Sequence, residues 1–275
     1  MVIPLQSSSQ KSTRLPTLGW IVALTAAGGV ASAMLAGVFL LLPESLRTKA
    51  LPHLVSFATG ALLGAALLAL LPEALERVGA DGAEGIGAAL LAGFGLFFVI
   101  EKLVLWRHAH SHEHDEMEHE AHAHSRDAAS GVLVIVGDSI HNALDGVLVA
   151  AAFLTDLRLG ILTVLAVAAH EVPHRVGDFA ILLHSGMSRR RALILNLVTG
   201  LTAVIGGILA WFGLRSAMGM LPYALAVAAA GFLYIAVAGL IPALHRRADP
   251  KTSLTQVVLI GLGVGVIAWA ESQLH

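Results

Sequence analysis

Two apolar stretches of the chain contain an unusual number of side chains that can bind a metal ion. The first reads GDSIHNALDG at residues 137–146, and the second reads HEVPHRVGD at residues 170–178. Imidazole nitrogens and carboxylate oxygens are ligands suited to zinc and to related divalent transition metals. The chain contains no cysteine, so a metal site must be built from nitrogen and oxygen ligands of this kind.

The spacing of these side chains predicts that they share one face of each helix. Residues three or four positions apart are neighbours on a helix surface. In the first stretch, His141 and Asp145 are four positions apart. In the second stretch, His170 and His174 are four apart, and Glu171 is three before His174. If the two helices pack antiparallel, the two faces meet at a similar depth and form one site.

Such residues are costly inside a membrane, where a charged side chain costs about 2.5 kcal/mol or more. A single buried histidine or aspartate more often supports helix contacts than binds a ligand. Nine polar or ionisable residues in two adjacent stretches instead favour a functional site. Pro173 strengthens this interpretation, because proline frees backbone carbonyls, which are tolerated at membrane depth where they line a cavity.

The composition predicts the elements that position these residues. Hydrophobic residues make up 56% of the chain, charged residues 13%, and the mean hydropathy is +0.78. An average soluble protein has about 25% charged residues. The apolar runs are about 20 residues long, as a transmembrane helix requires. We therefore predict an all-α polytopic membrane protein with eight transmembrane helices, near residues 17–42, 51–73, 84–106, 128–154, 159–184, 190–213, 219–243 and 254–273.

These segments divide the chain into four regions. A polar N-terminal tail covers 1–16, helices one to three cover 17–106, a histidine-rich loop covers 107–127, and helices four to eight cover 128–275 with the metal site. The loop contains seven histidines and almost no apolar residue, so we expect it to be disordered. Loose metal capture is favoured as its role over that of a solvated spacer.

Charge predicts the partners and the orientation. The net charge of −2 argues against a nucleic-acid partner, and the apolar segments predict the lipid bilayer as the surroundings. Most lysines and arginines lie in the connections after the odd-numbered segments, which predicts those connections in the cytoplasm and both termini on the non-cytoplasmic side. The short loops favour a multi-pass protein of a bacterial inner membrane.

The two motifs resemble those of the ZIP (Zrt/Irt-like) family of metal transporters, which carry HNxxDG on helix four and HExPHExGD on helix five in one large branch. Here they read HNALDG and HEVPHRVGD. The resemblance implies a ZIP-like bundle and a homodimer that carries Zn²⁺, or Fe, Mn or Cd, toward the cytoplasm. It also implies two ligand sets: a main site of His141, Asp145, His170 and His174, and a second site where Asn142 and Glu171 join Asp145 and His174.

The chain departs from the family pattern at Arg175, where the motif has Glu. A guanidinium is always charged and repels a cation unless an acid neutralises it. Glu171 and Asp178 are both spaced for such a pair. One interpretation, which we favour, makes Arg175 a structural residue that pairs with Asp178 and faces away from the ion path. In the other, a fixed positive charge replaces one metal ion.

Three other functions are considered. His170 to His174 also satisfies the HExxH pattern of an intramembrane zinc protease, and LDG at 144–146 resembles the element that supplies a third ligand there. That element precedes HExxH here rather than following it, and Pro173 would disturb the helix. A proton-coupled carrier is disfavoured by the histidine-rich loop. A metal sensor without transport would share every predicted ligand. We expect no enzymatic activity.

Overall fold

The computed structural model describes residues 14–113, 123–245 and 250–273, and within these ranges the chain forms helices joined by short turns, with no strand. Two of the short elements are π-helices (η1 and η4) and two are 3₁₀-helices (η2 and η3). In chain order the elements are α2 (Arg14–Phe39), α3 (Glu44–Gly64), η1 (Ala65–Leu70), α4 (Leu71–Val78), η2 (Ala80–Gly82), α5 (Ala83–Glu113), α6 (Ala123–Thr155), α7 (Leu157–His184), α8 (Arg189–Ser216), η3 (Met218–Met220), α9 (Leu221–Tyr234), η4 (Ile235–Leu240), α10 (Ile241–His245) and α11 (Pro250–Ser272).

Six of the described helical segments are long and apolar enough to cross a membrane. They are Thr17–Phe39, Glu44–Val78, Ala80–Leu103, Arg189–Ser216, Met218–His245 and Thr252–Ser272. The long helices α6 and α7 are not among the six, and they carry the ionisable residues of the predicted site. The all-α polytopic class is confirmed, whereas a total of eight crossings stays a prediction.

Two long helical segments, α3–η1–α4 and α9–η4–α10, each contain a short π-helix. η1 ends two residues before Pro72, and η4 ends two residues before Pro242. A proline ring lacks the N–H of a helical bond and clashes with the carbonyl four residues earlier. A π turn widens the helix at that point, so both segments continue past the proline.

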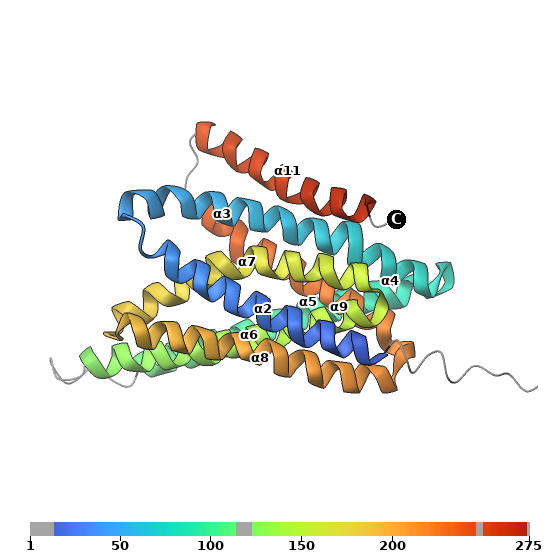
Figure 1. Cartoon of the computed structure of the whole chain (residues 1–275), viewed down its shortest axis with the longest axis horizontal. Helices are drawn as coiled ribbons and strands as arrows, with labels where there is room; N and C mark the ends of the chain where they lie inside the picture. Colours follow the sequence, from blue (N-terminus) through green and yellow to red (C-terminus); the bar gives the residue numbers. More distant parts are fainter. Residues whose placement is uncertain (1–13, 114–122, 246–249, 274–275) are drawn as a thin grey trace, which may run out of the picture.

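Helix α6 contacts α2, α5, α7, α8 and α9, and it lies alongside α8 (Figure 1). A Cβ at Gly146 would collide with the carbonyl oxygen of Ala203 on α8, and a Cβ at Gly206 would collide with that of Ala143. Small residues of this kind let backbones in a membrane approach one another. α7 packs against α2, α3 and α6, whereas α11 lies at the edge of the bundle against α3.

A very short link joins the two helices that carry the predicted site. α6 ends at Thr155 and α7 begins at Leu157, so only Asp156 lies between them. The Asp156 side chain caps α7 by accepting a hydrogen bond from the Arg158 backbone N–H at 2.8 Å. The two helices therefore run antiparallel as neighbours, as the sequence analysis required.

The histidine-rich tract lies partly outside the described residues. α5 continues to Glu113 and α6 begins at Ala123, so both helices extend into the region predicted as loop. Residues 114–122 lie outside the described residues. The predicted disorder of the tract stays a prediction.

Candidate metal centre

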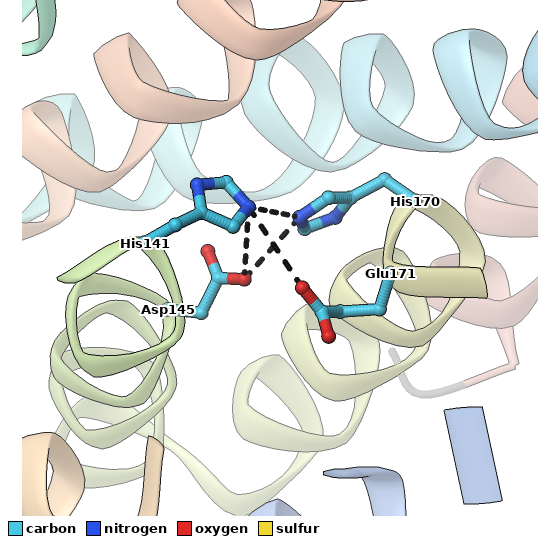
Figure 2. Close-up of side chains that lie close together, drawn as sticks. All are labelled: His141, Asp145, His170 and Glu171. Carbon is cyan, nitrogen blue, oxygen red and sulfur yellow. Dashed lines mark hydrogen bonds and ion pairs between the residues drawn. The ribbon is translucent and has the colours of Figure 1, made fainter. Parts of the chain in front are cut away.

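Four side chains from α6 and α7 point toward one another at the centre of the bundle (Figure 2). His141 and Asp145 come from α6, and His170 and Glu171 come from α7. One ligand atom from each of the four lies within 4.8 Å of the other three. We call these four residues the first group.

The distances within the first group fit a small metal ion. The two histidine Nε2 atoms, of His141 and His170, are 3.2 Å apart. Asp145 Oδ2 lies 3.2 Å from His170 Nε2 and 3.7 Å from His141 Nε2, and Glu171 Oε1 lies 3.8 Å from His141 Nε2. Ligands about 2 Å from a tetrahedral zinc ion are about 3.3 Å from each other. The first group is therefore close to the spacing that a shared ion requires.

The electrostatics of the first group also favour a cation. Asp145 Oδ2 and Glu171 Oε1 are buried and have no hydrogen-bond partner among the described residues. Leaving buried carboxylate oxygens unpaired is costly, and a bound cation would remove that cost. His170 Nδ1 lies 3.3 Å from the Ala166 carbonyl, so in the tautomer that donates there Nε2 is free to bind a metal. The His141 side chain is 20% exposed, so the first group is not completely sealed from its surroundings.

A second group with metal-ligand geometry lies one helical turn away. It contains Asp138, His174 and, shared with the first group, Glu171. His174 Nδ1 lies 2.9 Å from Asp178 Oδ2 and 3.8 Å from Asp138 Oδ1. The imidazole of His174 also stacks on that of His141, with ring centroids 4.8 Å apart. The two groups are therefore continuous.

Arg175 lies beside both groups and is completely buried. Its Nε donates to Glu171 Oε2 at 2.6 Å, its Nη2 donates to Asn142 Oδ1 at 2.7 Å, and its Nη1 donates to the Asn196 carbonyl at 2.5 Å. The expected salt bridge exists, but its acid is Glu171 rather than Asp178, because Asp178 pairs with His174. The guanidinium faces the site instead of pointing away from it.

The six ligands expected from the sequence are distributed over these features. His141, Asp145, His170 and Glu171 form the first group, and His174 belongs to the second. Asn142 belongs to neither group: its Nδ2 donates to Asp138 Oδ1 of the second group at 2.7 Å, and its Oδ1 accepts from Arg175. Their roles as metal ligands stay predictions.

Two contributions were not expected from the sequence. Asp138 enters the second group; its position three residues before His141 predicts it on the same helix face, but it was not among the six predicted ligands. The Asn196 backbone carbonyl on α8 binds Arg175, and sequence spacing carries no signal for such a backbone contact.

The geometry argues against the protease interpretation. Both histidines of an HExxH protease bind one ion. Here His170 lies in the first group and His174 in the second, and neither of these groups of described residues contains both.

Comparison with known proteins gives a consistent result. The profile of the family described as ZIP Zinc transporter matches residues 106–271. The chain is 30% identical to "Zinc transporter ZIP13" of Danio rerio over 290 residues, covering 85% of this chain and 82% of that protein. It is 34% identical to "Zinc transporter ZIP13" of Pongo abelii over 236 residues, covering 79% of this chain and 66% of that protein.

Another relative has a higher sequence identity over a shorter part of the chain. "Zinc transporter ZIP4" of Homo sapiens is 43% identical over 119 residues, covering 43% of this chain and 18% of that protein. The family profile spans both helices of the candidate metal centre, and the zebrafish relative is matched over most of its length. The chain belongs to the ZIP zinc transporter family.

Proposed function

We propose that this protein carries divalent transition-metal ions, zinc foremost, across a membrane through the first group between α6 and α7. The observation that carries the proposal is the convergence of four ligand atoms from two antiparallel helices within 4.8 Å. The proposal is supported by the names of the relatives, which are zinc transporters. Membership in a family of transport proteins also confirms the expectation that the chain is not an enzyme.

The ligand chemistry defines the class of ion. Two imidazoles and two carboxylates replace the water shell of a small divalent ion, and the absence of thiolates disfavours monovalent copper. The same ligand set accepts Fe²⁺, Mn²⁺ and Cd²⁺, which we propose as secondary substrates.

We also propose that the ions move toward the cytoplasm, from the first group to the second. The second group lies nearer the end of α6 that follows the histidine-rich tract and the end of α7 that precedes the three arginines 189–191 at the start of α8. Cytoplasmic connections are enriched in such positive residues. The His174 side chain is 37% exposed, whereas His170 is 1% exposed, which is consistent with an exit on the side of His174.

The wider setting is also part of the proposal. α2 begins and α11 ends at the same end of the bundle, which supports termini on one side of the membrane (Figure 1). We place that side outside the cytoplasm and propose a homodimer, as the resemblance implies. A bacterial inner membrane stays a prediction from the short loops, and the named relatives are vertebrate proteins.

Zinc uptake into proteoliposomes tests the function. We expect His170→Ala to reduce uptake by about tenfold or more, because it removes a buried ligand. The matched control is Thr163→Ala on the same helix, which removes an equally buried polar group whose hydroxyl donates to the Leu159 carbonyl of the preceding turn. Equal uptake by the wild type and His170→Ala would overturn the proposal. Zinc binding without uptake would indicate a sensor, and Glu171-dependent peptide hydrolysis would indicate a protease.

A further inference from the structure

The buried guanidinium of Arg175 is closely surrounded by hydrogen-bond acceptors from three helices. The residue is 0% exposed, and its three hydrogen bonds reach α6, α7 and α8. Gly200 on α8 leaves the space, since a Cβ there would lie 3.0 Å from Arg175 Nη2. Burying an ion is costly unless charge and hydrogen bonds compensate it fully. The surrounding side chains supply both kinds of compensation.

Arg175 uses oxygen atoms that a divalent cation would otherwise attract. Glu171 Oε2 and Asn142 Oδ1 are both hydrogen-bonded to the guanidinium. Glu171 Oε1 has no hydrogen-bond partner among the described residues and faces His141. The first and second groups therefore share a carboxylate of which one oxygen is already committed.

We propose that Arg175 is a fixed internal cation that holds Glu171 and Asn142 and so limits the connected first and second groups to one divalent ion at a time. This inference rests on the proposed function, because it assumes that the first group binds the transported ion. It makes Arg175 a positioning residue that contacts a metal ligand and not the metal itself.

Charge counting supports a single ion. The two groups and their neighbour Asp178 contain four carboxylates, those of Asp138, Asp145, Glu171 and Asp178. When ionised they carry four negative charges. Arg175 and one divalent ion supply three positive charges, whereas Arg175 and two divalent ions supply five. With Arg175 the site carries a net −1 after one ion and +1 after two, whereas without Arg175 two ions would neutralise the four carboxylates. Arg175 therefore lowers the net negative charge left to attract a second ion from −2 to −1 and leaves a doubly occupied buried site with excess positive charge, which is unfavourable.

The chain contains a matched pair for comparison. Arg77 binds Glu73 with the same spacing of four residues and the same 2.6 Å distance as Arg175 and Glu171. The Arg77 side chain is 36% exposed and lies on α4, where it also donates to the Thr155 carbonyl at 3.2 Å; neither Arg77 nor Glu73 belongs to the first or second group. Loss of Arg77 therefore reports the general effect of losing an Arg–Glu pair on a helix.

Native mass spectrometry of the full chain with added Zn²⁺ counts the bound ions. All variants carry the replacement of the seven histidines of residues 107–126 by serine, so that only the membrane site is counted. We expect one Zn²⁺ in the wild type and in Arg77→Gln, and two in Arg175→Gln. Arg175→Lys keeps the charge, and we expect one ion there as well.

Two ions in the wild type, or one ion in a folded Arg175→Gln, would overturn the inference and leave the proposed function intact. No ion in the wild type would instead remove the proposed function. If Arg175→Gln does not fold, the wild type and Arg175→Lys decide the matter. One ion in both then supports the inference, and two in either overturns it.

Discussion

At the scale of single residues, the site is defined by which atoms are left unpaired. Asp145 Oδ2 and Glu171 Oε1 are buried and without a hydrogen-bond partner among the described residues, while the other Glu171 oxygen binds Arg175. Polar atoms in this situation are rare in folded proteins and indicate a function or a bound ion. Burying these oxygen atoms without hydrogen bonds destabilises the fold, and binding of a cation, as proposed, would remove this cost.

The division into two groups predicts that the two histidines of α7 contribute unequally to zinc binding. We expect His170→Ala to weaken Zn²⁺ binding by about 10- to 100-fold, because His170 belongs to the first group. His174→Ala should weaken it by less than about tenfold and act mainly on the rate of uptake. Isothermal titration of both variants checks this, and an equal loss of affinity would show that both residues bind the same ion.

The hydrogen bonds of Arg175 predict a difference in stability between two asparagines. Asn142→Ala removes the acceptor of Arg175 Nη2, and an unpaired buried charged donor costs about 1–3 kcal/mol or more. Asn196→Ala is the control, because Arg175 binds the backbone carbonyl of Asn196, which alanine retains. Thermal unfolding in detergent should show a lower midpoint for Asn142→Ala. A larger loss in Asn196→Ala would contradict this account.

Part of the candidate site could be predicted from the sequence. The spacing of four residues placed His141 with Asp145 on one face, and the short link placed α7 opposite. The spacing did not show whether Glu171 or His174 would complete a group with His141, Asp145 and His170, because both lie on the same side of the helix. It favoured Asp178 over Glu171 as the partner of Arg175, whereas tertiary packing pairs Arg175 with Glu171 and Asp178 with His174.

At the scale of elements, the contact between α6 and α8 holds one half of the site in place. The collisions that a Cβ would cause at Gly146 and Gly206 show that the two backbones touch there. Gly146 directly follows Asp145 of the first group. Any separation of these helices would therefore move a predicted ligand.

The close contact between α6 and α8 predicts that one added methyl group at Gly206 lowers the stability of the protein. Gly206→Ala should destabilise the protein by about 1–3 kcal/mol, because the methyl group would overlap the Ala143 carbonyl. Gly213→Ala on the same helix is the control, since a Cβ there meets no heavy atom within 4 Å. Thermal unfolding of both variants provides the measurement, and similar midpoints would show that the helices can separate at little cost.

The hydropathy of the sequence located the helices but not their irregularities. Predicted segments such as 190–213 agree with α8 (Arg189–Ser216) within a few residues. The π-helices η1 and η4 were not predicted, because their apolar sequences AALLAL and IAVAGL match any buried helix. The proline two residues after each of them is the available signal, and it indicates a disturbed helix without specifying its form.

At the scale of the whole molecule, the surface is what a lipid environment requires. Large apolar side chains are exposed along the outer helices, among them Leu209 on α8 and Trp269 on α11. Such a surface would aggregate in water. The ionisable residues of the site lie inside the bundle, so lipid meets an apolar exterior.

The absence of cysteine makes the proposed orientation directly testable. We expect Asp81→Cys, in the exposed turn between α4 and α5, to react with a membrane-impermeant maleimide in intact cells. Arg190→Cys, at the start of α8, should react only after the membrane is permeabilised. The unmodified chain is a blank, because it contains no thiol. The opposite labelling pattern would reverse the proposed direction of transport.

The single-residue link at Asp156 limits how far α6 and α7 can move apart at one end. α6 and α7 are tied together at that end, so their ligands cannot part there. Any increase in the distance between the two helices is therefore largest toward their opposite ends, nearer to Asp138, His174 and Asp178. For the proposed transport, we therefore expect the ion to leave at the end where Asp138, His174 and Asp178 lie, whereas entry from the opposite side requires movement of helices other than this pair.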